Sequence, residues 1–276
     1  LTTTAAIASG KTIDGSGSVA ITALHSTLAA NLGAITASGG VTAEFAGSNT
    51  FAGTIGNATV NVTAGNTFTT TAAIASGKTI AAAGNGNIAI TALHSTLSAN
   101  LANLSSASGN VTAAFGGNGT FEGVLGNAVV TVADDVTMTA AANKVAGKTI
   151  NKSGSGSDNG ALAVRIGTAD NDDNLTTIGG TATKTFTVFE NVTFIGTLHG
   201  SIATSVADGV TLTIAANLAA GKTINKQNSS GAVAVQIGTA DNDDNLTTIT
   251  GMATKTFTVF ESVTFSGVLH GSIKTS

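Results

Sequence analysis

The densest ionisable side chains in this sequence form one acidic block that occurs twice. The block reads GTADNDDNLTTI at residues 167–178 and recurs letter for letter at residues 238–249. Carboxylate and amide oxygens crowded into one turn suit Ca²⁺, which takes about six to eight oxygen ligands. The candidate calcium ligands are therefore Asp170, Asp172, Asp173, Asn174, Asp241, Asp243, Asp244 and Asn245.

The block differs from familiar calcium loops, and a structural interpretation stays open beside the metal. Leu175 stands where an EF-hand loop needs glycine, and the block is not a tandem nonapeptide calcium repeat. Asp and Asn also stabilise turns by bonding to nearby backbone without any metal. The two copies start 71 residues apart (238 − 167), so the sequence predicts two separate turns or two separate sites.

Other side chains with chemical potential give no comparable cluster. The histidines form two aligned pairs without an acid or a second histidine at ligand spacing, which favours turn or surface roles: His25, His94, His199 and His270. Cysteine is absent, which excludes disulfides and thiolate metal sites. The net charge of −4 comes without a basic patch or aromatic platform, so nucleic acid is not an expected partner.

The acidic blocks belong to a repeat of about 70 residues that occurs four times. Its KTI marker begins at Lys11, Lys78, Lys148 and Lys222, and the repeats span 1–67, 68–137, 138–211 and 212–276. Repeats one and two share ALHSTL, whereas repeats three and four share the acidic block. Stacked repeats bury a core that none could bury alone, so we expect one elongated domain over 1–276, part of a longer chain.

Each repeat reads as a series of short β-strands. Val, Ile, Thr and Phe alternate with small polar residues, and clusters of Gly, Asn, Ser and Asp separate the runs. Stretches of 20–27 residues suit one coil of a parallel β-solenoid, with about three coils per repeat. The predicted class is therefore all-β, a parallel β-solenoid. An antiparallel β-sandwich array is the alternative, disfavoured because two-residue hairpin turns are few.

Strand alternation predicts which side chains face the core. Phe68, Met138 and Leu212 occupy equivalent inward positions, with threonines on either side facing out. An aligned ladder of phenylalanines is expected in the core rather than as a binding platform: Phe45, Phe51, Phe115, Phe121, Phe189, Phe194, Phe260 and Phe265. The stretch beginning at Leu93, LHSTLSANLANL, is expected to be irregular or a strand.

Composition limits the classes of function. Hydrophobic residues make up 42% and charged residues 9%, which is too apolar for a disordered chain. No apolar run approaches the roughly 20 residues of a membrane-spanning helix, so no membrane span is expected in this segment.

The Gly/Asn/Thr/Ala-rich strands, the unequal tandem repeats and the absence of cysteine resemble bacterial extracellular β-strand-repeat proteins. These include autotransporter passengers, filamentous-haemagglutinin-like adhesins and surface-layer proteins. The resemblance implies an exported, non-enzymatic stalk or filament subunit at the bacterial cell surface. Expected partners are further copies, end to end or side by side, and surface glycans or a host receptor. The alternatives are a calcium-ordered glycan- or receptor-binding module, a solenoid polysaccharide lyase and an ice-binding protein.

Overall fold

A computed structural model describes residues 1–154 and 157–271. The pairings between its described strands are parallel, which confirms the predicted all-β parallel solenoid and excludes the antiparallel sandwich. The chain divides into two compact units. The first is Leu1–Val136 with Thr149–Gly160, and the second is Thr137–Lys148 with Ala161–Ser276.

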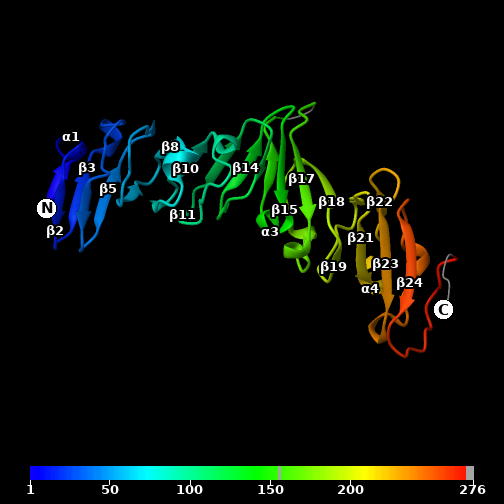
Figure 1. Ribbon diagram of the computed structural model, residues 1–276. Coiled ribbons are helices and arrows are strands. Elements are labelled where there is room, and N and C mark those ends of the chain that lie inside the picture. Colours follow the sequence, from blue (N-terminus) through cyan, green and yellow to red (C-terminus); the bar gives the residue numbers. More distant parts are fainter. Residues whose placement is uncertain (155–156, 272–276) are drawn as a thin grey trace. The chain divides into compact units, whose positions relative to one another are not determined.

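In the first compact unit, consecutive strands from β5 to β12 alternate between two parallel sheets, so these coils contribute to both. One sheet has the order β1-β3-β5-β7-β9-β11, and β3 and β5 are seen side by side in Figure 1. The other sheet contains β6, β8, β10, β12, β14 and β16, while β2 pairs with β4. The bounds are β1 Thr2–Thr4, β2 Ile13–Gly15, β3 Val19–Thr22, β4 Ile35–Ala37, β5 Val41–Phe45, β6 Asn49–Thr50, β7 Thr59–Val62, β8 Thr67–Thr71, β9 Ile80–Ala82, β10 Asn87–Thr91, β11 Leu104–Ser106, β12 Val111–Phe115, β13 Gly119–Phe121, β14 Val129–Val132 and β16 Ile150–Lys152.

The second compact unit repeats this architecture. One of its sheets runs β15-β17-β18-β20-β22, and the other runs β19-β21-β23-β24. The bounds are β15 Thr137–Ala141, β17 Ala161–Ile166, β18 Thr183–Val188, β19 Val192–Phe194, β20 Thr204–Val206, β21 Thr211–Ala215, β22 Ile224–Lys226, β23 Ala232–Ile237 and β24 Thr254–Val259.

The register of the strands sharpens the predicted coil count from about three to three and a half per repeat. In one sheet Thr3, Ile21, Ala43 and Val60 stack in register, so three coils take 57 residues (60 − 3). Thr70, the counterpart of Thr3 in the next repeat, lies in β8 of the other sheet. The ten residues from Val60 to Thr70 therefore supply an additional half coil. Within the first compact unit, equivalent residues of repeats one and two consequently lie on opposite sides of the coil stack.

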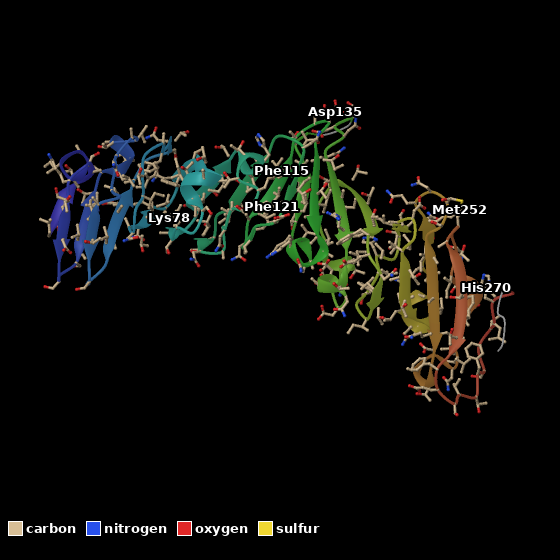
Figure 2. All side chains as sticks on the ribbon, in the orientation of Figure 1. Lys78, Phe115, Phe121, Asp135, Met252 and His270 are labelled. Atoms are coloured by element: carbon tan, nitrogen blue, oxygen red, sulfur yellow. The ribbon has the colours of Figure 1, made fainter. Side chains whose placement is uncertain are left out.

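The core follows the predicted alternation. Phe68, Met138 and Leu212 are fully buried, as predicted. Figure 2 labels Phe115 and Phe121, which are also fully buried, between the strands of the first compact unit. The remaining phenylalanines of the predicted ladder that are fully buried are Phe45, Phe51 and Phe194.

The ladder prediction was wrong for two phenylalanines, and a third, Phe265, is only partly buried. Phe189 is 36% exposed and Phe260 54% exposed, because each lies just beyond its strand and three positions after the inward ring, Phe186 or Phe257, which alternation places on the outer side.

The inward ring of β18 is Phe186, and Phe189 instead lies under the Arg165 guanidinium, 4.0 Å from the ring centre. Phe189 and Phe260 precede the next phenylalanine of the ladder by five residues, whereas Phe45 and Phe115 precede theirs by six. This difference of one residue moves the ring from the core to the surface.

Each repeat also contains a single helical turn where the sequence suggested only strand. These turns are α1 Ala5–Ala8, α2 Ala72–Ala75, α3 Ala142–Val145 and α4 Ala216–Ala219. Thr4 and Thr71 cap α1 and α2 by accepting a backbone N–H at 3.4 Å. The stretch beginning at Leu93 opens as a short 3₁₀ turn, η2 (Leu93–Ser95), equivalent to η1 (Leu24–Ser26). Within the described ranges, no helix has the length and apolar character needed to cross a membrane.

Candidate functional site: the acidic turns

The acidic block replaces a strand of the coil. In repeats one and two the segment after the ALHSTL turn returns as β4 or β11. In repeats three and four that strand is absent: the turn that matches η1 and η2 is followed by a second 3₁₀ turn. The bounds are η3 Thr168–Asp170, η4 Leu175–Thr177, η5 Thr239–Asp241 and η6 Leu246–Thr248. The first block follows β17 and the second follows β23, which belong to different sheets. The structure therefore gathers each set of four candidate ligands into one turn and places the two sets on opposite sides of the stack.

The first aspartate of each block is a helix cap supplied by the neighbouring coil. Asp170 is buried, and its Oδ1 accepts the Asn143 N–H of α3 at 3.0 Å while its Oδ2 accepts the Gly167 N–H at 2.9 Å. The cap position of α3 itself is Ala141, which has no side-chain oxygen to offer. Asp170 thus replaces, from the next coil, the threonine cap found in repeats one and two.

The second block reproduces this arrangement. Asp241 Oδ1 accepts the Asn217 N–H of α4 at 2.8 Å, and its Oδ2 accepts the Gly238 N–H at 2.8 Å. Ala215 stands at the cap position of α4. The exchange of a threonine cap for an aspartate from the next coil therefore occurred in both repeats that carry the block.

The asparagine of the block has the same structural role in all four repeats, including the two that lack the acidic block. Asn174 Oδ1 accepts the Thr176 N–H at 3.1 Å and the Thr176 hydroxyl at 2.6 Å. Asn245 does the same with Thr247. In the repeats without the acidic block, Asn31 and Asn100 accept the N–H two residues ahead in the same way and make the same bridge to the next coil.

Asp173 stands where the earlier repeats bury an alanine. The residue before the bridging asparagine is Ala30 or Ala99 in repeats one and two, and both are fully buried. Their backbone carbonyls and that of Asp173 accept equivalent N–H groups from the next coil, at 2.9 to 3.0 Å. Asp173 Oδ2 is buried and lacks a hydrogen-bond partner among the described residues. Repeat four has the same orphaned oxygen on Asp244.

This placement makes the carboxyl of Asp173 unusually basic. Burial, reinforced by the neighbouring charges of Asp170 and Asp172, raises its pKa to about 6. Burial and the charges of Asp241 and Asp243 likewise raise the pKa of Asp244. An orphaned oxygen in an acidic turn is satisfied either by a proton or by a cation, so the turn can take up positive charge. Within the described residues, however, no three acidic or histidine side chains converge as a metal-ligand group.

The sequence analysis did not identify Glu190 as a residue that joins coils. Glu190 Oε1 accepts the N–H and the hydroxyl of Thr168, which begins η3 one coil earlier. These bonds hold the pKa of Glu190 below its ordinary value. Glu261 contacts Thr239 in the same way, at 3.1 and 3.0 Å. The spacing could have predicted this contact, because each glutamate follows its threonine by 22 residues, the length of one coil.

The histidines have structural contacts, in keeping with the turn roles predicted for them. His25 Nδ1 accepts the Ala46 N–H at 3.3 Å, and His94 Nδ1 accepts the Gly116 N–H at 3.2 Å. His199 stacks on Phe186, with ring centres 5.6 Å apart. Burial and the charges of Lys184 and Lys222 lower the pKa of His199, which favours its neutral form.

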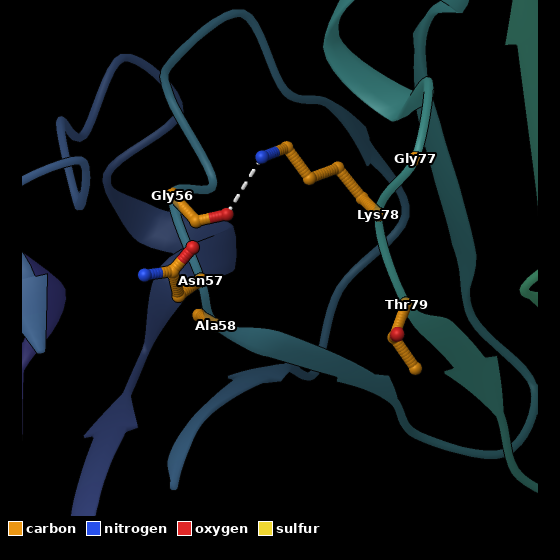
Figure 3. A pocket seen from close by; sticks show the side chains of 6 residues that line it. All are labelled: Gly56, Asn57, Ala58, Gly77, Lys78 and Thr79. Carbon is orange, nitrogen blue, oxygen red and sulfur yellow. Dashed lines mark hydrogen bonds between the residues drawn. The ribbon is translucent and has the colours of Figure 1, made fainter. Parts of the chain in front are cut away.

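The KTI lysine of repeat two lines a small polar hollow of about 190 Å³, shown in Figure 3. Its lining consists of Gly56, Asn57, Ala58, Gly77, Lys78 and Thr79. The Lys78 ammonium donates to the Gly56 carbonyl at 2.8 Å, one coil earlier. This lysine therefore joins adjacent coils. The residues that line the hollow include no ionisable side chain besides Lys78.

Comparison with protein-family models, with curated protein sequences and with solved structures found no match for this chain.

Proposed function

We propose that this chain is a non-enzymatic structural protein of the bacterial cell surface, in which stacked coils act as a stiff stalk or filament subunit. The observation that carries the proposal is the pair of parallel ladders running along both sides of each compact unit. Through these ladders, successive coils of the described residues are hydrogen bonded to one another and packed on an apolar core. Such a stack resists bending and stretching because deformation must break many backbone bonds together.

The polar side chains support the same proposal because they join coils. Asp170 caps α3, Lys78 bonds to Gly56, and Glu190 holds Thr168, each across one coil step. A solenoid lyase would need basic and acidic groups gathered in one groove. An ice-binding surface would need Thr-x-Thr pairs on one flat side. The half-coil offset places the Thr-rich strands β1 and β8 in different sheets, which disfavours a single flat array of threonines.

The proposed location at the cell surface rests on the resemblance to extracellular β-strand-repeat proteins. The test is surface labelling of intact cells that make the protein. An impermeant amine reagent should modify its lysines, and external protease should remove the protein without lysing the cells. A cytosolic control protein must stay unlabelled. Labelling only after lysis would contradict the proposed location.

A second candidate is a calcium-ordered module whose acidic turns contact glycans or a host receptor. The orphaned oxygens of Asp173 and Asp244 favour it, since a bound cation would neutralise them. Calcium should then raise the melting temperature of the EDTA-treated protein, and the double variant Asp173→Ala/Asp244→Ala should lose that increase. A melting temperature that is the same with calcium and with EDTA would remove this candidate.

A further inference from the structure

One turn of the second compact unit is a residue longer than its counterpart in the first. Thr54, which bridges to the preceding coil, lies six residues before Val60, the partner of a KTI isoleucine (60 − 54). The equivalent residues of repeat three are Thr197 and Thr204, which are seven residues apart (204 − 197). The longer turn has the sequence His199-Gly200-Ser201. The added residue changes what the next KTI lysine can contact.

That lysine, Lys222, lacks the bond that its counterpart makes. The Lys78 ammonium donates to the Gly56 carbonyl of the shorter turn at 2.8 Å. The Lys222 ammonium has no hydrogen-bond acceptor among the described residues. A Cβ built on Gly200 would lie 3.9 Å from Lys222 Nζ and, its chain neighbours aside, within 4 Å of no other heavy atom. An unpaired ammonium therefore lies beside open space at Gly200.

His199 supplies a second donor in the same turn. Its ring stacks on Phe186, with ring centres 5.6 Å apart and planes inclined by 24°, which fixes its orientation. His199 Nδ1 accepts the Ser201 N–H at 3.3 Å, so the proton of the neutral ring lies on Nε2. Nε2 has no acceptor within the part of the chain that the structure describes. The imidazole therefore keeps one N–H for a ligand.

The charge around this turn is positive and lacks a balancing carboxylate. Burial and the charges of Lys184 and Lys222 lower the pKa of His199, and no carboxylate of the described residues opposes them. Lys184 lies in β18 two residues before the ring that stacks on His199, and thus on the same side of the strand. Its ammonium already donates to two backbone carbonyls, at 2.6 and 3.3 Å. Lys184 therefore contributes charge, whereas Lys222 and His199 have donors to spare.

We propose that this turn binds a single oxyanion group, a phosphate or a sulfate, beside Gly200. The Lys222 ammonium and the His199 Nε2–H are its donors. A hydrogen bond between an ionised donor and an ionised acceptor is about twice as strong as a neutral one, so the two donors suit an oxyanion. The same chemistry serves a free anion and an anionic group carried on a sugar. The site uses none of the candidate calcium ligands and does not depend on the proposed stalk.

Calorimetric titration with sodium sulfate, with chloride holding the ionic strength constant, tests the lysine. Lys222→Gln should weaken sulfate binding at least about tenfold, the loss expected for one charged hydrogen bond. It removes no hydrogen bond of the folded chain, so its melting temperature should not fall. Lys78→Gln is the matched control and should keep the affinity of the unmodified protein. An unmodified protein that does not bind sulfate, or equal affinity in Lys222→Gln, would overturn the site.

Nuclear magnetic resonance of the histidines tests the site at His199 itself. Sulfate should raise the pKa of His199, because a bound anion stabilises the imidazolium, and chloride at equal ionic strength should not. The spectrum of His199→Gln identifies its resonance. The resonances of His25 and His94, which belong to the first compact unit, should not move. Equal movement of all the histidine resonances would show general screening and would contradict a site.

Gly200→Asp tests the position of the ligand by supplying a carboxylate from the chain. Gly200 does not have the positive φ that favours glycine, so the backbone admits a side chain there. Without sulfate, this variant should raise the pKa of His199, and it should no longer bind sulfate. Gly200→Asn has the same size without the charge and should leave the pKa of His199 unchanged. A Gly200→Asp variant that binds sulfate like the unmodified protein would place the anion elsewhere and overturn the assignment.

The source of the oxyanion group is read by comparing two ligands. Tighter binding of glucose 6-sulfate than of inorganic sulfate would assign the site to a sulfated sugar. Equal or weaker binding would assign it to the free anion. Absence of binding for both would overturn the proposal. None of these results bears on surface labelling of cells, so a failed site and a failed surface role can be told apart.

Discussion

At the scale of single residues, the acidic block separates into four different roles. Asp170 caps a helix in the adjacent coil, and Asn174 closes its own turn. Asp172 is exposed to solvent. Asp173 alone brings a carboxyl into a position that repeats one and two fill with buried alanine, and it leaves one oxygen without a partner. A run of like residues therefore carries one unusual group rather than a uniform patch of charge.

The raised pKa of Asp173 predicts that the second compact unit is more stable in mild acid. In the folded chain the carboxyl titrates near pH 6, against about 3.9 when unfolded. Between these values the folded form binds a proton that the unfolded form does not. The free energy of unfolding should therefore increase as the pH falls through about 6, and this gain should disappear when the pH is raised above 6. We expect a gain of about 1 kcal/mol after solvent screening, measured by thermal melts from about pH 8 to pH 5.

Substitutions with the residues of the other repeats test this assignment. Asp173→Ala should raise the melting temperature at about pH 8 and flatten the pH dependence, because the buried charge is gone. The converse change, Ala30→Asp in repeat one, should lower the melting temperature, and more so at about pH 8 than at pH 5. A steeper pH dependence in Asp173→Ala would contradict the role given to this carboxyl.

At the scale of elements, the coils are held close by glycines at one position in each repeat. A Cβ built on Gly123 would lie 2.1 Å from the Ala99 carbonyl oxygen, and one on Gly53 2.1 Å from that of Ala30. The carbonyl belongs to the residue before the bridging asparagine. The bridge between coils thus requires a residue without a side chain opposite it.

Gly123→Ala should consequently destabilise the first compact unit by about 1–3 kcal/mol, because backbone must shift to admit the methyl group. Gly15→Ala is the matched control, since a Cβ there meets no atom within 4 Å. Urea unfolding of the two variants measures the difference. Equal midpoints for Gly123→Ala and the unmodified protein would show that the bridge tolerates a side chain.

At the scale of the whole molecule, the offset of half a coil per repeat decides which groups face the same way. Within one sheet Glu44, Asn61, Ala81 and Ser105 stack in register over three coils. Ala114 is the counterpart of Glu44 in repeat two, yet it lies in the other sheet. Residues at equivalent positions of repeats one and two therefore do not lie on the same side of the coil stack.

Spin labels on introduced cysteines can measure this offset in the first compact unit. The pair Glu44→Cys/Ser105→Cys should give a distance near the ~14 Å rise of three coils. The pair Glu44→Cys/Ala114→Cys should give a clearly longer distance, because the width of the stack adds to a rise of ~17 Å. Electron paramagnetic resonance reads both distances. Similar values for the two pairs would support three whole coils per repeat.

The sequence predicted the coil class and the inward residues of the first strands, because alternation and the KTI spacing are local properties. It could not predict the half coil, since that depends on which strands pair and not on strand length. It also identified the acidic block without its roles. The cap on α3 becomes visible only when Asp170 is seen beside Ala141, the position in the neighbouring coil where a threonine is missing.

Because each repeat adds half a coil beyond three, adding an odd or an even number of repeats has different consequences for the surface. Inserting one repeat into a stack turns every later coil by half a revolution, so each downstream turn emerges on the opposite side. Inserting two repeats returns those turns to their original side. Unequal recombination between repeats would change length in single steps, but only even steps would preserve the surface that the later coils display.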